Sequence, residues 1–193
     1  MSDFFLGLDL GQANDYTALG AIERIGGEEG PATWHLRHLE RMRGVPYPQV
    51  VARVAAVMVA EPLRAHCRLV VDATGVGQPV VDLLAAAGLW PIAVFIHGGQ
   101  QATLDKGAWH VPKRDLVAVV QVLLQSARLR IAASLPLAGV LEQELLNFRV
   151  TIDFKTAHDS YAAWCEGQHD DLVLAVALAC WYGERGLVTV RAW

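Results

Sequence analysis

Two strongly apolar segments of this 193-residue chain each contain an aspartate close to their end. The segment FFLGLDLG carries Asp9, and the segment CRLVVDATGVG carries Asp72. Runs rich in leucine and valine are typical of strands that are buried on both faces of a sheet. A carboxylate in such a strand is costly unless a neighbouring group compensates its charge. The sequence therefore predicts an α/β sheet with two acidic positions that need a partner.

The composition indicates a folded globular chain. Hydrophobic residues make up 53% of the sequence and charged residues 19%, and the net charge is −4. That charge argues against a generally basic nucleic-acid binder but leaves room for a local basic face. The three cysteines have no metal-binding spacing and indicate reduced thiols. With no signal-peptide pattern and no apolar run long enough to span a bilayer, we expect a soluble cytoplasmic protein without a membrane partner.

The first half of the chain predicts three antiparallel strands followed by parallel β-α-β units. A glycine-rich turn at residues 26–30 separates the second strand from the third, which is a hairpin signal. Alternating helices and strands then imply right-handed parallel crossovers. The expected strands are 4–10, 16–25, 32–42, 68–72 and 91–96, and the expected helices are 49–61 and 78–87.

The second half is predicted to be mostly helical. Residues 97–110 show no periodicity and are expected to be a long loop, within which Trp109 is a candidate ligand-contacting residue. The segment RLRIAA is a candidate short strand, and 148–152 with 161–164 is a candidate late hairpin. The remaining expected helices are 112–127, 137–147 and 170–184.

A third acidic cluster, Asp170-Asp171 preceded by His169, stands at the start of the last apolar helix. Three antiparallel strands, αβ units and a terminal helix together form the plan of a ribonuclease-H-like mixed sheet flanked by helices. In that plan the first and fourth strands are central neighbours, so Asp9 and Asp72 would lie together. The start of the last helix would bring Asp170 and Asp171 to the same edge.

Carboxylates that converge in this way predict a divalent metal site. Mg²⁺ prefers oxygen ligands and takes a few carboxylates together with waters and phosphate oxygens. A pair of such ions can activate a water and stabilise the leaving oxygen of a displacement on phosphorus. In this hypothesis Asp9 bridges the metals, Asp72 holds one, and Asp171 or Asp170 holds the other, with Asp171 favoured. Asp15 is a candidate supporting ligand, and His169 is a candidate to position a water or the scissile phosphate.

Simpler interpretations exist for each of these residues. Asp72 could cap the following helix, because aspartate is a preferred N-cap residue. The pair Asp170-Asp171 could only complement a helix dipole. Lys113 and Arg114 start a helix, where cations oppose the dipole, so they face either a DNA phosphate or solvent. Arg41 belongs to an alternating basic stripe with Arg37 and Arg43 that could contact the DNA backbone or be an ordinary exposed strand face.

Four stretches in this order resemble the nuclease domain of tailed-phage large terminase subunits. They are GLDLGQANDYTALGAIE, VVDATGVGQPVVDLL, VPKRDLV and EGQHDDLVLAVALACW, and they extend over nearly the whole chain. The resemblance implies a ribonuclease-H-like endonuclease that uses Mg²⁺ or Mn²⁺ to cut concatemeric viral DNA during genome packaging. It places the catalytic acids on Asp9, Asp72 and the Asp170-Asp171 pair, and it matches Asp15 and His169 to an accessory acid and histidine.

The resemblance also implies partners: double-stranded DNA, a terminase ATPase domain, a small terminase subunit and a portal. The chain has no G-x-x-x-x-G-K-[ST] phosphate loop. We therefore expect residues 1–193 to be one nuclease domain without an ATPase motor. Two alternatives stay open, a Holliday-junction resolvase on the same fold and an actin-like or sugar-kinase-like nucleotide-binding protein.

Overall fold

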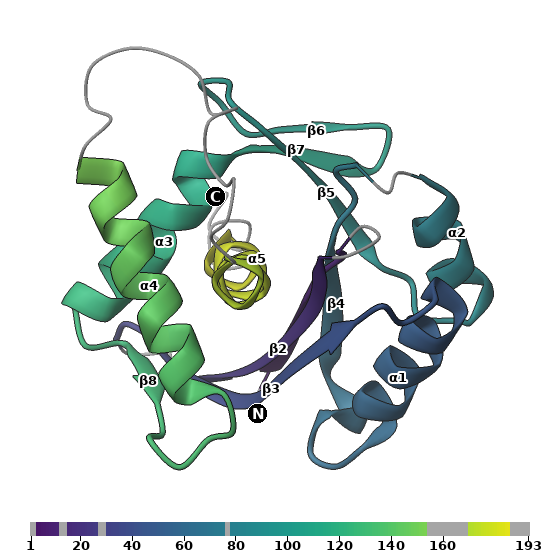
Figure 1. Ribbon diagram of the computed structural model, residues 1–193, viewed down its shortest axis with the longest axis horizontal. Coiled ribbons are helices and arrows are strands. Elements are labelled where there is room, and N and C mark those ends of the chain that lie inside the picture. The colour runs from purple at the N-terminus through teal and green to yellow at the C-terminus, as the bar shows by residue number, and fades with distance from the viewer. Residues whose placement is uncertain (1–2, 12–14, 27–29, 76–77, 154–169, 186–193) are drawn as a thin grey trace.

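The computed structural model describes residues 3–11, 15–26, 30–75, 78–153 and 170–185. Within them, one eight-stranded mixed sheet has the order β6-β7-β5-β4-β1-β2-β3-β8 (Figure 1). The antiparallel trio is β1 (Asp3–Asp9), β2 (Tyr16–Ile25) and β3 (Thr33–Arg43). Parallel pairing joins β1 to β4 (Cys67–Asp72) and then β4 to β5 (Ile92–His97). The strand order and directions confirm the mixed sheet predicted from the sequence.

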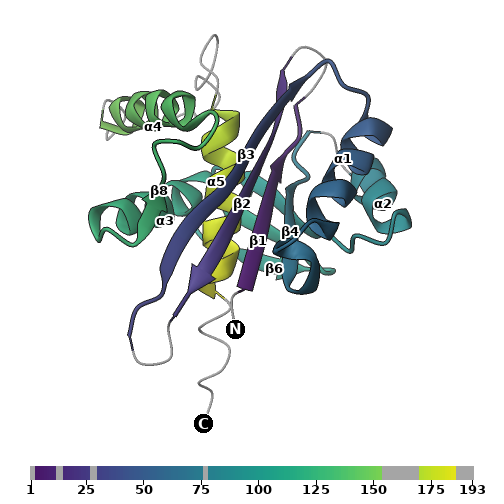
Figure 2. The ribbon, with the colours of Figure 1, turned by 90° about the horizontal axis from the view of Figure 1, so that it is seen from below.

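Helices cover both faces of this sheet. On one face lie α1 (Tyr47–Val59) and α2 (Gln78–Ala86), with the short 3₁₀ helix η1 (Leu63–Ala65) after α1 (Figures 1 and 2). On the other face α5 (Asp171–Arg185) packs against the strands, and α3 (Lys113–Gln125) and α4 (Ala138–Asp153) lie outside it. The central helix is therefore enclosed between the sheet and a second helical layer.

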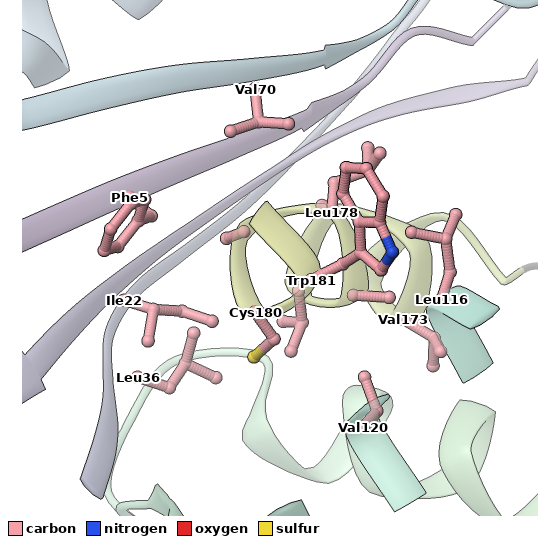
Figure 3. Packing of buried hydrophobic residues seen from close by; sticks show 14 of the residues in the cluster. Phe5, Ile22, Leu36, Val70, Leu116, Val120, Val173, Leu178, Cys180 and Trp181 are labelled. Carbon is pink, nitrogen blue, oxygen red and sulfur yellow. The ribbon is translucent and has the colours of Figure 1, made fainter. Parts of the chain in front are cut away.

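This enclosure explains why the α5 sequence is apolar around its whole circumference. A helix that is hydrophobic on all sides needs partners on all sides, and every residue from Asp171 to Trp181 is buried. In Figure 3 Val173 and Leu178 of α5 lie between the strands, marked by Phe5 and Val70, and Leu116 of α3. Gly7 permits this close packing, because a Cβ at that position would overlap the carbonyl oxygen of Ala175.

Strand alternation decides which face the acidic positions take. Side chains at positions i and i+2 of a strand point to the same face. Phe5 and Val70 belong to the core cluster built around α5, whereas Leu6 and Val71 belong to the cluster under α1 and α2. Two residues beyond Gly7 and Val70, Asp9 and Asp72 therefore share the face that α5 covers.

The predicted loop at 97–110 is wrong. It contains β6 (Thr103–Asp105) and β7 (Ala108–Pro112), which form an antiparallel hairpin at the sheet edge, with β7 parallel to β5. The two-residue turn places Lys106 and Gly107 at positive φ angles of 47° and 85°, as a tight hairpin requires. The short β6 is exposed and leaves no alternation in the sequence. Trp109 lies on β7 and packs edge-on against Trp181, 5.5 Å between ring centroids.

The late hairpin is also wrong at its first strand, since α4 continues through 148–152 to Asp153. Its second strand, 161–164, lies outside the described residues. The candidate strand RLRIAA is confirmed as β8 (Leu129–Ile131), which pairs in parallel with β3. The other helices and strands begin and end within about two residues of the predicted bounds.

Candidate active site

Asp9 and Asp72 end two neighbouring strands at the same level. The parallel register pairs Leu8 with Val71, so the next residues along β1 and β4 are the two aspartates. Both strands are mostly apolar and buried up to that point, and burial on both faces fixes their register. Asp72 is 8% exposed, and Asp9 is more accessible. The sheet therefore presents two carboxylates side by side under the first turn of α5.

The Asp72 carboxylate is held by its own turn. Its Oδ1 accepts the backbone N–H of Thr74 at 2.8 Å, and the Thr74 hydroxyl accepts the N–H of Ile96 at 2.7 Å. Gly75 follows at a φ of 82°, which suits glycine. Asp72 thus stabilises the turn that follows β4 through Oδ1, and its Oδ2 takes no part in that hydrogen bond.

At the start of α5, Asp170 forms an ion pair with Lys113 of α3. The Lys113 ammonium lies 3.1 Å from Asp170 Oδ2, and both side chains are about one-fifth exposed. Lys113 is the first residue of α3, directly after Pro112 at the end of β7. Because β7 and β5 run parallel beyond β4, the end of β7 brings Lys113 to the same sheet edge as Asp72.

The adjacent Asp171 is bound from the opposite side, by Arg41 of β3. Arg41 Nε donates to Asp171 Oδ2 at 2.5 Å, and its Nη2 donates to Oε1 of Glu144 at 2.8 Å. The guanidinium also lies over the ring of Tyr16, 4.1 Å from its centre. The Arg41 side chain is only 13% exposed. Its observed partners are therefore inside the protein, and its predicted contact with DNA stays a prediction.

The four aspartates interact electrostatically as one group. Burial raises the pKa of Asp9 well above its usual value, and the charges of Asp72, Asp170 and Asp171, in that order, raise it further. Burial also raises the pKa of Asp72, to which the Asp170 charge adds, while the Thr74 hydrogen bonds and Lys113 lower it. The charge of Asp170 therefore acts on both strand-end acids.

Such a group suits a hard divalent cation. Clustered carboxylates hold each other's pKa high because their negative charges repel, and a cation bound among them reverses that effect. Oxygen donors from short aspartates match the preference of Mg²⁺ or Mn²⁺. Within the described residues, no three acidic, histidine or cysteine side chains already stand in ligand geometry. The donor chemistry fits a metal, while Lys113 and Arg41 supply the positive charge between and beside the acids.

Of the three remaining predicted residues, the structure describes Asp15 and Arg114. Asp15 is exposed and lines a pocket of about 260 Å³ with Gly11, Thr17 and Tyr47 among its neighbours. The Arg114 guanidinium is bonded to the side chain and backbone of Gln100. His169 lies outside the described residues. In the part of the chain that is described, no helix is both long and apolar enough to cross a membrane.

Sequence reasoning missed Glu144, which contacts this group from α4. Its side chain is 6% exposed, and its Oε2 accepts the backbone N–H groups of Leu172 and Val173 at 3.1 and 3.2 Å. Burial and the neighbouring Asp171 raise the pKa of Glu144 to about 7, although Arg41 and the two amides oppose the shift. In the sequence it stands in LEQELL, which is typical of a solvated helix, so no local signal marks it.

The topology and the acidic sheet edge together define a ribonuclease-H-like fold of the kind found in terminase nucleases. No protein-family model matches the chain, and no curated protein matches it. Several solved structures, in contrast, match the fold of the chain. The large terminase nuclease of thermophilic phage G20c superposes with a TM-score of 0.61 at 20% identity, over 92% of this chain and 81% of that one.

Two further structures give the same result. The G20c nuclease with bound zinc has a TM-score of 0.57 at 21% identity, over 92% of this chain and 80% of that one. The human cytomegalovirus terminase nuclease domain, soaked with manganese, has a TM-score of 0.53 at 16% identity, over 91% and 80%. The resemblance to terminase nucleases predicted from the sequence is therefore confirmed at the level of the fold.

Proposed function

We propose that this chain is a metal-dependent endodeoxyribonuclease of the terminase type, which cuts concatemeric viral DNA during genome packaging. The observation that carries the proposal is the meeting of Asp9, Asp72 and the Asp170-Asp171 pair at one sheet edge. The shared fold supports it, as do the zinc and manganese named for the similar structures. Double-stranded DNA is the proposed substrate. A terminase ATPase domain, a small subunit and a portal are the proposed partners.

In this proposal Asp9, Asp72 and Asp170 hold the metal, and Asp171 has a supporting role. Asp170 is preferred because its Oδ2 is paired with the more exposed and flexible Lys113, whereas Asp171 Oδ2 is bound by the less exposed Arg41. This assignment reverses the preference that the sequence suggested. Mg²⁺ or Mn²⁺, one or two ions, would polarise the phosphodiester and activate the attacking water.

The chain's own groups position the substrate. The turn at Thr74 holds one oxygen of Asp72 and so orients the other. Lys113 has a flexible stem and a compact charge, and it can move from Asp170 to a phosphate oxygen when DNA enters. Contacts of this kind go to the DNA backbone, so we expect weak sequence specificity. Asp15 and His169 remain proposed accessory groups.

The test is a plasmid-nicking assay in Mg²⁺, Mn²⁺ or EDTA with wild type and Asp72→Asn. Asparagine keeps an oxygen for the Thr74 amide but loses the charge. We expect metal-dependent nicking without ATP, reduced in the variant by roughly 100-fold or more, since removing even an outer-shell partner of a metal ligand costs 10–100-fold. Asp82→Asn is the matched control, because Asp82 is an exposed residue of α2 that bonds Gln78.

Two results would overturn the proposal: no nicking by wild type with either metal, or equal nicking by Asp72→Asn. A four-way junction offered beside the plasmid separates the resolvase alternative, which predicts strong preference for the junction. ATP binding measured by calorimetry separates the nucleotide-binding alternative in the same way.

A further inference from the structure

The first turn of α5 is capped by a side chain from another helix. The first four N–H groups of a helix have no acceptor within it. Here the N–H groups of Leu172 and Val173 both donate to Oε2 of Glu144, 28 and 29 residues earlier in the chain. A carboxylate at a helix N-terminus also complements the helix dipole. Glu144 therefore does for α5 what a local N-cap residue usually does.

The second oxygen of the same carboxylate holds Arg41. Glu144 Oε1 accepts Arg41 Nη2 at 2.8 Å, and Arg41 Nε donates to Asp171 Oδ2 at 2.5 Å. The Arg41 guanidinium also lies over the Tyr16 ring, 4.1 Å from its centre, which is a further contact that holds it in place. One buried carboxylate on α4 is thus joined to α5 by two routes, directly through two backbone amides and indirectly through Arg41 and the Asp171 side chain.

Both routes end on the segment that carries the acids. Asp170 and Asp171 immediately precede the two amides, so a shift of the first turn moves both carboxylates. The bond from Arg41 Nε to Asp171 Oδ2 links the orientation of the Asp171 carboxylate to that of Arg41. With side chains of Asp171 and Glu144 at 9% and 6% exposure, water offers little substitute for these bonds.

We propose that Glu144 is a positioning residue of the active site, which fixes the first turn of α5 and, through Arg41, the orientation of Asp171. This inference rests on the proposed nuclease function. It means that α4, which carries Glu144, helps to position the acids of the site. Glu144 touches neither substrate nor metal in this role. Its effect reaches the reaction through the placement of the aspartates.

Two substitutions separate the two routes. Glutamine at 144 can still accept the Leu172 and Val173 amides through its oxygen, but its NH₂ group then faces the donors of Arg41. Alanine removes both routes. Glu142→Gln is the matched control, since Glu142 is an exposed residue on the same helix.

The experiment measures nicking kinetics at saturating Mn²⁺ and amide hydrogen exchange at Leu172 and Val173. For Glu144→Gln we expect kcat to fall by about 10–100-fold with KM for DNA unchanged, and the two amides to stay protected. For Glu144→Ala we expect the same fall in kcat and faster exchange at both amides. All rates are taken well below the unfolding temperature of each variant.

The inference is overturned if wild type nicks DNA and both variants keep kcat within twofold of Glu142→Gln, even if their unfolding temperatures fall. That result would leave the nuclease function intact and reduce Glu144 to a stabilising residue. If wild type does not nick DNA at all, the nuclease function fails. The exchange data then test separately whether Glu144 fixes the first turn of α5. Unchanged protection of the Leu172 and Val173 amides in Glu144→Ala would refute that role of Glu144.

Discussion

The two aspartates that begin α5 are paired with cations in contrasting ways. Asp171 is bound by Arg41, whose guanidinium is fixed by Glu144 and Tyr16 and is 13% exposed. Asp170 is bound by Lys113, and both members of that pair are about one-fifth exposed. A planar guanidinium with several fixed donors is a rigid partner, whereas an ammonium on a four-carbon stem is easily moved.

This difference indicates that the Arg41–Asp171 pair and the Lys113–Asp170 pair have different roles. The Arg41 pairing has the contacts of a permanent structural element. The Lys113 pairing lies on the side of Asp9 and Asp72, whose pKa values Lys113 lowers. An ammonium in that place offsets the negative charge that a metal ion would otherwise offset. In the candidate active site we therefore expect Arg41 to keep its carboxylate partners when a metal ion binds, and Lys113 to be displaced from Asp170.

The largest expected effect is on stability without metal. Arg41→Met leaves two buried carboxylates without their partner, which costs about 3 kcal/mol or more. Lys113→Met breaks a partly exposed pair and should cost less than about 1 kcal/mol. Chemical unfolding in EDTA measures both, with Arg37→Met as the control for an exposed arginine on the same strand. Equal losses from the two variants would contradict the comparison.

The next effect concerns metal affinity. Removing the Lys113 charge should strengthen Mn²⁺ binding by about tenfold, or roughly 1.4 kcal/mol, because no ammonium then competes for the carboxylates. Isothermal calorimetry without DNA measures this, and Arg114→Met is the control because Arg114 pairs with Gln100 and Asp115 instead. An unchanged or weaker affinity in Lys113→Met would show that Lys113 does not offset the acids.

A pH dependence is also expected on the Arg41 side. Burial raises the folded-state pKa of Glu144 to about 7 from an ordinary value of 4.5. The folded state therefore binds this proton more tightly, so the Glu144 contribution to stability is full below about pH 4.5 and is lost as pH rises through about 7. Wild type should lose stability relative to Glu144→Gln between pH 5 and pH 8. A difference in unfolding free energy that does not change over that range would contradict this.

Most of the fold was predictable because it is encoded locally. Apolar runs, a glycine-rich turn and proline-led helices mark the elements on either side of Asp9 and Asp72, and each signal depends on neighbours in the chain. The β6–β7 hairpin was missed because its exposed edge strand has no apolar alternation. The extension of α4 to Asp153 was missed because Phe148 to Ile152 is rich in β-favouring residues.

The sequence by itself determined that acids end two buried strands and begin a buried helix, since a carboxylate at the end of an apolar run is visible without a structure. Only the tertiary structure decided which cation pairs with each acid. Arg41 and Glu144 are 103 residues apart and meet Asp171 only when β3, α4 and α5 pack together. The physical reason is that pairing of charges depends on distance in space and on burial, and neither can be read from local sequence for residues so far apart.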